Sequence, residues 1–103
     1  MNIVLEVGTK NYGNDLLVIK KSLSHMESLV DGYNGYTLSE PSSKFGWTFF
    51  KLVFKPNLQN GIEEKFHDMI QRYPSSAYAE KFANFISDFF ISKGCDVKIR
   101  ISD

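Results

Sequence analysis

The chain contains few side chains whose chemistry could support catalysis: two histidines and one cysteine. His25 and His67 are far apart in the sequence, and neither has a second ligand at the spacing that metal sites use. His67 is followed directly by Asp68, but neighbouring residues on a helix point apart and cannot form a catalytic dyad with each other. These residues therefore predict neither a metal site nor a general base.

The cysteine and the paired glutamates also have simple structural interpretations. Cys95 follows Gly94 at the end of a predicted helix, whereas a reactive thiolate needs a helix N-terminus or a cationic neighbour, so we expect a small buried residue. Glu63 and Glu64 lie in the predicted first turn of a helix, where the helix dipole favours anions. With no glycine-rich phosphate loop either, the sequence predicts a protein that is not an enzyme and needs no cofactor.

Bulk composition favours a small soluble domain. The 103 residues, 43% of them hydrophobic and 15% aromatic, predict one domain over residues 1–103 with a core that needs neither disulfide nor metal. A formal net charge of zero argues against general nucleic-acid binding, which requires a surplus of cations. The first ten residues contain no signal peptide pattern and the sequence contains no membrane span, so we expect a cytoplasmic protein.

The most strongly apolar stretch of the sequence, residues 45–55, predicts the central strand of a sheet. Pro56 ends this strand, because proline cannot donate to a ladder of hydrogen bonds. Apolar residues occupy both sets of alternate positions, which predicts a strand covered on both sides and places Trp47 in the core. One set contains Phe45, Trp47, Phe49 and Val53, and the other contains Thr48, Phe50, Leu52 and Phe54.

Three further strands are predicted around this one. Ile3 to Val7 is a short apolar run, and Cys95 to Ile101 alternates apolar and polar residues as a half-buried strand does. Tyr36 to Glu40 is expected to pair antiparallel with residues 45–55 through a turn at Glu40-Pro41-Ser42-Ser43.

Helical spacing of apolar residues predicts three helices between these strands. The first follows a cap at Asn14 or Asp15 and runs to Val30. An alternative is that residues 16–19 form a hairpin with residues 3–7. The second helix follows a loop over residues 57–61 and ends before Pro74, and the third runs from a cap at Ser75 or Ser76 to Lys93 and Gly94. The resulting β-α-β-β-α-α-β order predicts an α/β (α+β) two-layer domain with a mixed sheet.

Charged residues are distributed unevenly along the chain. The three charged residues from Lys44 to Lys55 are all basic and lie among aromatic residues, which would also suit a small nucleic-acid-binding module. Before Lys44, five acidic residues outnumber three basic ones. We predict a protein-binding surface where tyrosines lie close in sequence to acidic residues, because tyrosine is favoured at interfaces and carboxylates steer basic partners. Its residues are Asp31, Tyr33, Tyr36 and Glu40.

In the last quarter of the chain, an amphipathic helix leads into Lys93-Gly94-Cys95-Asp96 and an alternating strand. This segment resembles the barstar family of intracellular ribonuclease inhibitors, which ends with a similar helix, Gly-Cys-Asp and strand. The acidic inhibitory helix of the family has no counterpart in the first half of this chain, so no inhibitory residue is carried over. More broadly, the chain is similar to the immunity proteins that protect bacteria from their own toxins, including those of contact-dependent growth inhibition systems.

Together these features predict a non-enzymatic inhibitor that binds another protein. The resemblance implies an immunity protein that neutralises a bacterial toxin domain, and the predicted acidic surface suits a basic toxin or nuclease domain. A phage-type anti-defence inhibitor and a small nucleic-acid-binding module are the alternatives. The prediction includes no membrane partner and leaves the oligomeric state open.

Overall fold

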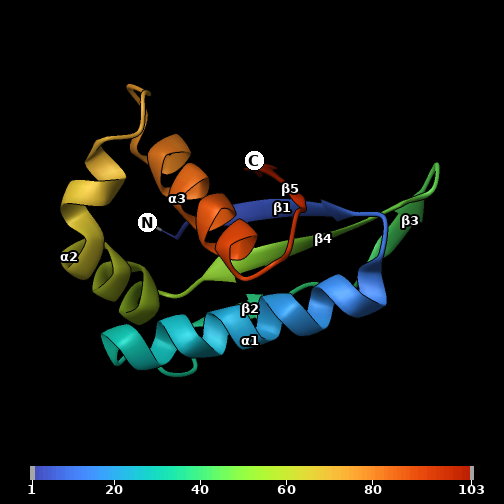
Figure 1. The fold of residues 1–103 in the computed structure, drawn as a ribbon, viewed down its shortest axis with the longest axis horizontal. Coiled ribbons are helices and arrows are strands. Elements are labelled where there is room, and N and C mark those ends of the chain that lie inside the picture. The colour runs from blue at the N-terminus through green and yellow to red at the C-terminus, as the bar shows by residue number, and fades with distance from the viewer. Residues whose placement is uncertain (1, 103) are drawn as a thin grey trace.

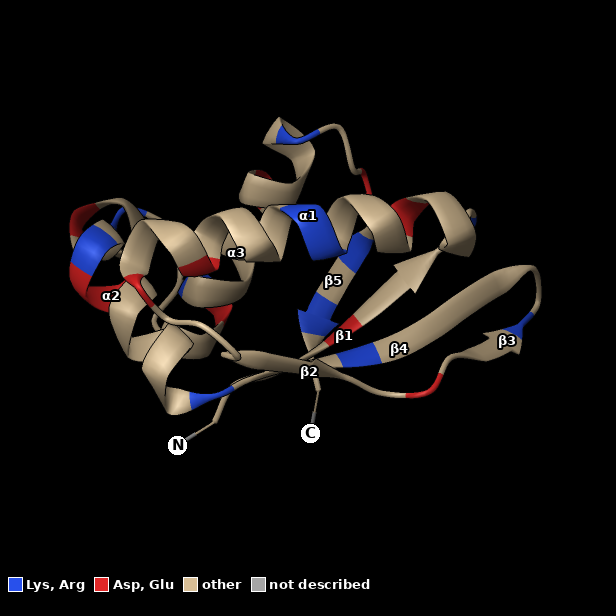
Figure 2. Cartoon of the chain, turned by 90° about the horizontal axis from the view of Figure 1, so that it is seen from below, with Lys and Arg blue, Asp and Glu red and all other residues tan. Residues whose placement is uncertain are grey.

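The structure is a computed structural model that describes residues 2–102, and it has two layers (Figures 1 and 2). Helices form one layer and an antiparallel sheet forms the other. None of the helices in the described range has both the length and the apolar character needed to cross a bilayer. The elements are β1 (Val4–Thr9), α1 (Tyr12–Val30), β2 (Tyr36–Leu38), β3 (Ser42–Lys44), β4 (Trp47–Phe54), α2 (Pro56–Gln71), α3 (Tyr78–Ser92) and β5 (Lys98–Ile101).

The sheet has the strand order β2-β4-β1-β5, and β3 pairs with the other end of β4 on the same side as β2. The predicted two-layer α+β architecture and the interior position of β4 are confirmed. The predicted mixed sheet is wrong, because every pair of strands is antiparallel. After the crossover through α1, strand β2 runs parallel to β1, but the two do not pair because β4 lies between them. This order is that of the β-α-β-β-α-β arrangement of ferredoxin-like domains.

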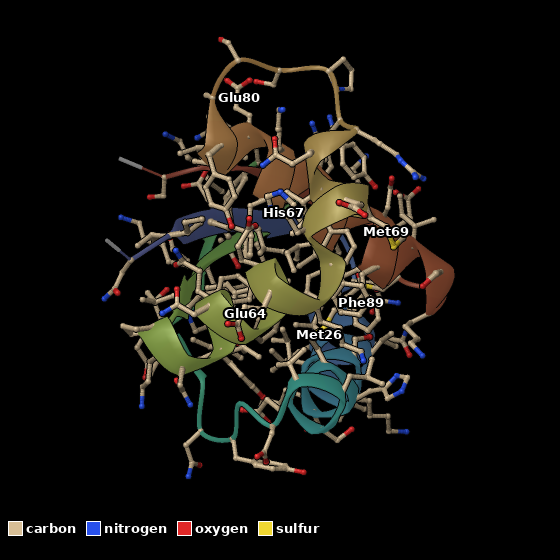
Figure 3. The ribbon with its side chains drawn as sticks, turned by 90° about the vertical axis from the view of Figure 1, so that its left-hand side faces the viewer. Met26, Glu64, His67, Met69, Glu80 and Phe89 are labelled. Carbon is tan, nitrogen blue, oxygen red and sulfur yellow. The ribbon has the colours of Figure 1, made fainter. Side chains whose placement is uncertain are left out.

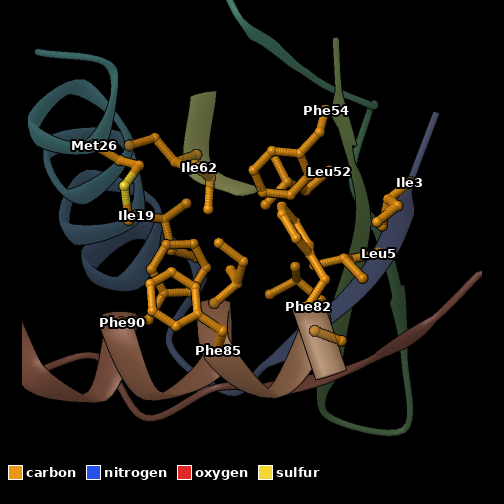
Figure 4. Packing of buried hydrophobic residues seen from close by; sticks show 14 of the residues in the cluster. Ile3, Leu5, Ile19, Met26, Leu52, Phe54, Ile62, Phe82, Phe85 and Phe90 are labelled. Carbon is orange, nitrogen blue, oxygen red and sulfur yellow. The ribbon is translucent and has the colours of Figure 1, made fainter. Parts of the chain in front are cut away.

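The core lies between the sheet and the helices. Phe50, Leu52 and Phe54 of β4 are almost completely buried and point toward this layer, as Figure 4 shows for Leu52 and Phe54. Phe54 meets Phe82 of α3 edge to face, with the ring centroids 5.1 Å apart. Such pairs add about 0.5–1.5 kcal/mol to the gain from burial.

The opposite face of β4 is not covered by helices (Figure 2). Trp47, Phe49 and Val53 are partly exposed there, and Lys51 is exposed. The predicted burial of both faces, with Trp47 in the core, is therefore wrong. All three helices of the described chain pack on the same side of the sheet, so the alternate positions of β4 are left facing away from the core.

Helix α1 begins at Tyr12 with Asn11 as its cap residue, so the predicted cap at Asn14 or Asp15 is wrong. The chain turns tightly after β1 because the backbone N–H of Asn11 donates to the Thr9 hydroxyl at 2.9 Å, and that hydroxyl donates to the Asp15 carboxylate. The alternative hairpin is wrong, since residues 16–19 lie within the helix. The helix ends at Asp31, which adopts a left-handed conformation with a φ of 55°.

Helix α2 begins at Pro56 rather than after a loop over residues 57–61. Proline suits the first helical position because its fixed φ matches the helix and no N–H is needed there. Glu63 and Glu64 consequently lie in the middle of α2, so their predicted role in the first turn is wrong. Ala77, not Ser75 or Ser76, is the cap residue of α3, although its N–H donates to the Ser75 hydroxyl at 3.1 Å.

The predicted turn at residues 40–43 is also wrong, because Ser42 and Ser43 belong to β3. The chain reverses two residues later, at Phe45-Gly46, between the paired residues Lys44 and Trp47. Both turn residues have positive φ values, 53° and 80°, as a two-residue type I′ hairpin requires. The β3–β4 hairpin extends beyond the end of the helical layer (Figure 1).

Neighbouring residues of β4 provide a test of this one-sided packing. Phe54→Ala should lower the free energy of unfolding by about 3–5 kcal/mol, because it removes a buried aromatic ring and leaves a cavity. Val53→Thr, on the uncovered face, should change it by less than about 1 kcal/mol. Urea unfolding followed by circular dichroism measures both, and equal losses would contradict the assignment of the two faces.

Candidate functional site

The uncovered face of the sheet contains a hollow with a volume of about 730 Å³. We call it the β4 groove. It lies between the β3–β4 hairpin and the middle of strands β4, β1 and β5. Its lining includes Trp47, Phe49 and Lys51 of β4, Lys44 and Phe45 of the hairpin, Glu6 of β1, Arg100 of β5, and Glu40.

A row of three charged residues crosses the floor of the groove. Glu6 of β1 lies opposite Lys51 on one side and opposite Arg100 on the other. The guanidinium of Arg100 holds the Glu6 carboxylate, with Nη2 at 2.5 Å and Nε at 2.6 Å from Oε1. Lys51 makes no ion pair with any residue in 2–102, so its ammonium group is available to an external anion.

The next row of the sheet contains an aromatic pair. Phe49 lies opposite Gly8, and a Cβ atom at Gly8 would come within 3.0 Å of the Phe49 ring. Phe49 also stacks with Trp47, with centroids 6.4 Å apart. The ammonium groups of Lys10 and Lys98 lie 4.9 Å and 5.1 Å from the Trp47 ring centroid, so the π system of this ring already binds cations.

Phe45, at the tip of the hairpin, is the most exposed large hydrophobic residue described, at 91%. Its only ring contact within residues 2–102 is with the Lys44 ammonium, 5.6 Å from the ring centroid. The sequence interpretation had placed Phe45 inside the strand. The glycine that follows it was the available signal for a turn, but Phe-Gly is not among the usual hairpin pairs.

The uncovered face of the sheet is mostly basic at its strand positions. The strand residues that point outward include four cations and one acid, a net charge of +3, and the rest of the sequence has eight basic and eleven acidic residues, a net charge of −3. Figure 2 shows the basic segments along β3, β4 and β5. The five outward charged residues are Lys44, Lys51, Lys98, Arg100 and Glu6. At the margins of this face lie Lys10, Glu40, Asp15 and Asp96.

The structure separates the four residues of the predicted protein-binding surface. Asp31 and Tyr33 are exposed on the loop after α1, where the Tyr33 carbonyl accepts a hydrogen bond from the Asn57 side chain at 2.8 Å. Tyr36 is half-buried against the core, and burial, followed by the charge of Glu27, raises its pKa. Glu40 lies four residues after Tyr36, which is about 13 Å along an extended chain, and it lines the β4 groove. That these residues bind a partner stays a prediction, but they do not form one continuous patch.

The histidines are not part of the groove. His67 is exposed on α2 (Figure 3), and its Nδ1 lies 2.6 Å from Oε1 of Glu63. The second oxygen of this carboxylate accepts a hydrogen bond from the Tyr78 hydroxyl at 2.8 Å, and the pKa of Tyr78 is raised by burial and by this bond. Glu63 therefore links α2 to α3. Within residues 2–102, no three side chains of His, Cys, Asp or Glu are grouped closely enough to hold a metal ion.

Cys95 is buried, which confirms its predicted place in the core. Only 1% of the residue is exposed, and its sulfur lies 4.0 Å from the backbone carbonyl oxygen of Asp15. Burial, with smaller contributions from the charges of Asp15 and Asp96, raises the pKa of the thiol to about 11. A thiol of this kind is a poor nucleophile at neutral pH.

Comparison with known proteins provides no relative for this chain: no family model, curated protein or solved structure matches it.

The fluorescence of Trp47, the single tryptophan, provides a test of the charge around the groove. We expect iodide to quench it more strongly than caesium does, relative to free N-acetyltryptophanamide, because Lys10 and Lys98 attract anions to the ring. A Lys10→Gln/Lys98→Gln variant should lose this preference, while quenching by neutral acrylamide changes little. Ionic strength must be held constant because salt screens these charges. An equal response to both ions in the parent protein would contradict the placement of the lysines.

Cys95 should react slowly with a thiol reagent such as Ellman's reagent at pH 8, because the folded state buries the thiol and keeps it protonated. Since the folded pKa of about 11 exceeds the ordinary value of 9.0, the contribution of this group to stability is complete below pH 9 and is lost as the pH rises toward 11. Urea should restore full reactivity. Complete labelling of the native protein within minutes would contradict this placement of Cys95.

Proposed function

We propose that the protein is a non-enzymatic inhibitor that binds a partner protein through the tip of the β3–β4 hairpin and the adjoining β4 groove. The immunity proteins that neutralise bacterial toxins are the class that this mode of action suits best. The observation that carries the proposal is the state of Phe45, a bulky aromatic residue that is 91% exposed and has a positive φ.

This combination is unfavourable for the isolated protein. A left-handed conformation costs a residue other than glycine about 1–2 kcal/mol, and asparagine, aspartate and glycine are preferred at this turn position. The exposed ring of Phe45 is not buried against the core, so packing does not offset the cost. An unfavourable conformation at an exposed aromatic residue is typical of binding sites, where the ring becomes buried in the partner.

The hairpin also presents this ring on a stable support. Strand β4 pairs with β1 in the centre of the sheet, and its inward side chains form part of the core. The position of Phe45 relative to the groove is thus set before binding. Such preorganisation reduces the conformational entropy that association would otherwise cost.

Two alternative functions use the same face. A phage-type anti-defence inhibitor would make the same kind of contact with a different target. A nucleic-acid-binding module is supported by the aromatic residues beside Lys51 and Arg100. It is less favoured, because the Trp47 ring is already covered by Lys10 and Lys98 rather than free for a base, and acidic residues line the groove.

Phe45→Asn tests the proposal without weakening the hairpin, because it creates the Asn-Gly pair that type I′ turns prefer. We expect the variant to be as stable as the parent or more stable by about 1 kcal/mol, since asparagine tolerates a positive φ. The immunity function requires a toxin domain encoded next to this gene, and coexpression with that domain in a bacterial host should show that the parent protein restores growth and that the variant does not.

Leu17→Gln is the matched control for this experiment, because Leu17 is an apolar residue that is 61% exposed on the helical layer. This variant should protect as well as the parent does. Full protection by Phe45→Asn would exclude the hairpin tip as the contact, and failure of the parent protein to protect would exclude the immunity function.

A further inference from the structure

The β4 groove has a chemical character that suits one kind of partner segment, if the protein acts as the binding protein proposed above. One end of the groove is apolar, with Phe45 and Phe49 on its lining, and the middle contains Lys51. The Lys44 ammonium lies near the Phe45 ring, and, like Lys51, it makes no ion pair within residues 2–102. Apolar and cationic groups are thus adjacent on one surface.

We propose that the groove binds an acidic segment of the partner protein, in which a large apolar side chain lies against Phe45 and Phe49 and a neighbouring carboxylate pairs with Lys51. The charged residues that line the groove are three basic and two acidic, a net charge of +1, and the outward strand residues together carry +3, so the charge of this face favours an acidic segment. Charge complementarity of this kind raises the association rate and selects against basic partners. The negative charge of this segment is opposite to that of the basic partner that Asp31 and Glu40 predicted from the sequence.

The internal ion pair of the groove limits what the ligand can be. Glu6 is already bound by Arg100 at 2.5 Å, so this pair is nearly neutral and Lys51 remains the floor cation that has no ion pair within residues 2–102. A ligand with evenly spaced phosphates would place negative charge against Glu40, whereas a peptide can place one carboxylate at Lys51 and apolar atoms elsewhere. The groove therefore favours a protein segment over a nucleic acid.

A second copy of this chain is a poor occupant of the same surface. Two such faces would each bring a net charge of +3 into contact, and like charges facing each other across an interface are unfavourable. We thus expect the purified protein to remain monomeric at low salt, as measured by light scattering.

Selection from a display library of random peptides of about twelve residues tests the proposed chemistry directly. The full-length protein is the bait, and the enriched peptides should contain a large apolar residue close to Asp or Glu. A synthetic peptide of the enriched sequence should bind at least about tenfold more weakly to Lys51→Glu and to Phe45→Asn than to the parent. The control variant Lys20→Glu, which alters an exposed lysine on α1, should bind within about twofold of the parent.

Other outcomes would overturn this inference. The library could enrich basic or uncharged peptides, or enrich none. Oligothymidylate could bind more tightly than any selected peptide. Light scattering could also show a dimer whose formation is altered by Lys51→Glu. The result also separates the inference from the proposed function. If the enriched peptides lack acidic residues but still require Phe45, the groove chemistry proposed here is wrong while the binding role of the hairpin stands. If Phe45→Asn protects fully in the coexpression experiment, the proposed function fails whatever the library yields.

Discussion

The two-residue periodicity of β4 is the constraint on which the rest of the structure depends. Because alternate side chains of a strand point to opposite faces, placing Phe50, Leu52 and Phe54 under the helices forces Trp47, Phe49 and Lys51 outward. The core and the candidate site are therefore two consequences of one strand register. A shift of this register by one residue would expose the core residues and bury Lys51.

The uncovered face is stabilised by interactions within it rather than by a second layer. Gly8 allows Phe49 to lie across β1, the Trp47 ring contacts Phe49 and two lysines, and Arg100 satisfies the charge of Glu6. An exposed ion pair of this kind contributes at most about 1 kcal/mol to stability. These interactions contribute little to stability, and the exposed ring of Phe45 is the aromatic group that can gain more contact in a complex.

The sequence predicted the fold better than it predicted the site. A short apolar run identified β1, alternation identified β5, and helical spacing identified α1 and α3, because these patterns follow directly from one-sided burial. The predicted start of the last strand at Cys95 is wrong, since β5 begins at Lys98. The sequence could not show that β4 is covered on one side only, because an aromatic residue in an apolar stretch gives the same pattern whether it is exposed or buried. The turn at Phe45-Gly46 was missed for a related reason: Phe45 has strong strand preference and unusual backbone geometry for a turn. The residues that line the groove are position 6, eight positions between 40 and 51 together with position 39, and position 100, and only strand pairing brings them together.

The pairing of β1 with β5 has a consequence for how the chain folds. Glu6 meets Arg100, a partner 94 residues away in the sequence, and β1 lies between β4 and β5 rather than at an edge. One side of β1 therefore stays unpaired during synthesis until β5 has left the ribosome, so the complete sheet forms after nearly all of these residues have been translated. Contacts of such long sequence separation also slow folding relative to helical proteins of similar size. During that interval the apolar strands β1 and β4 are accessible to chaperones and to other nascent chains.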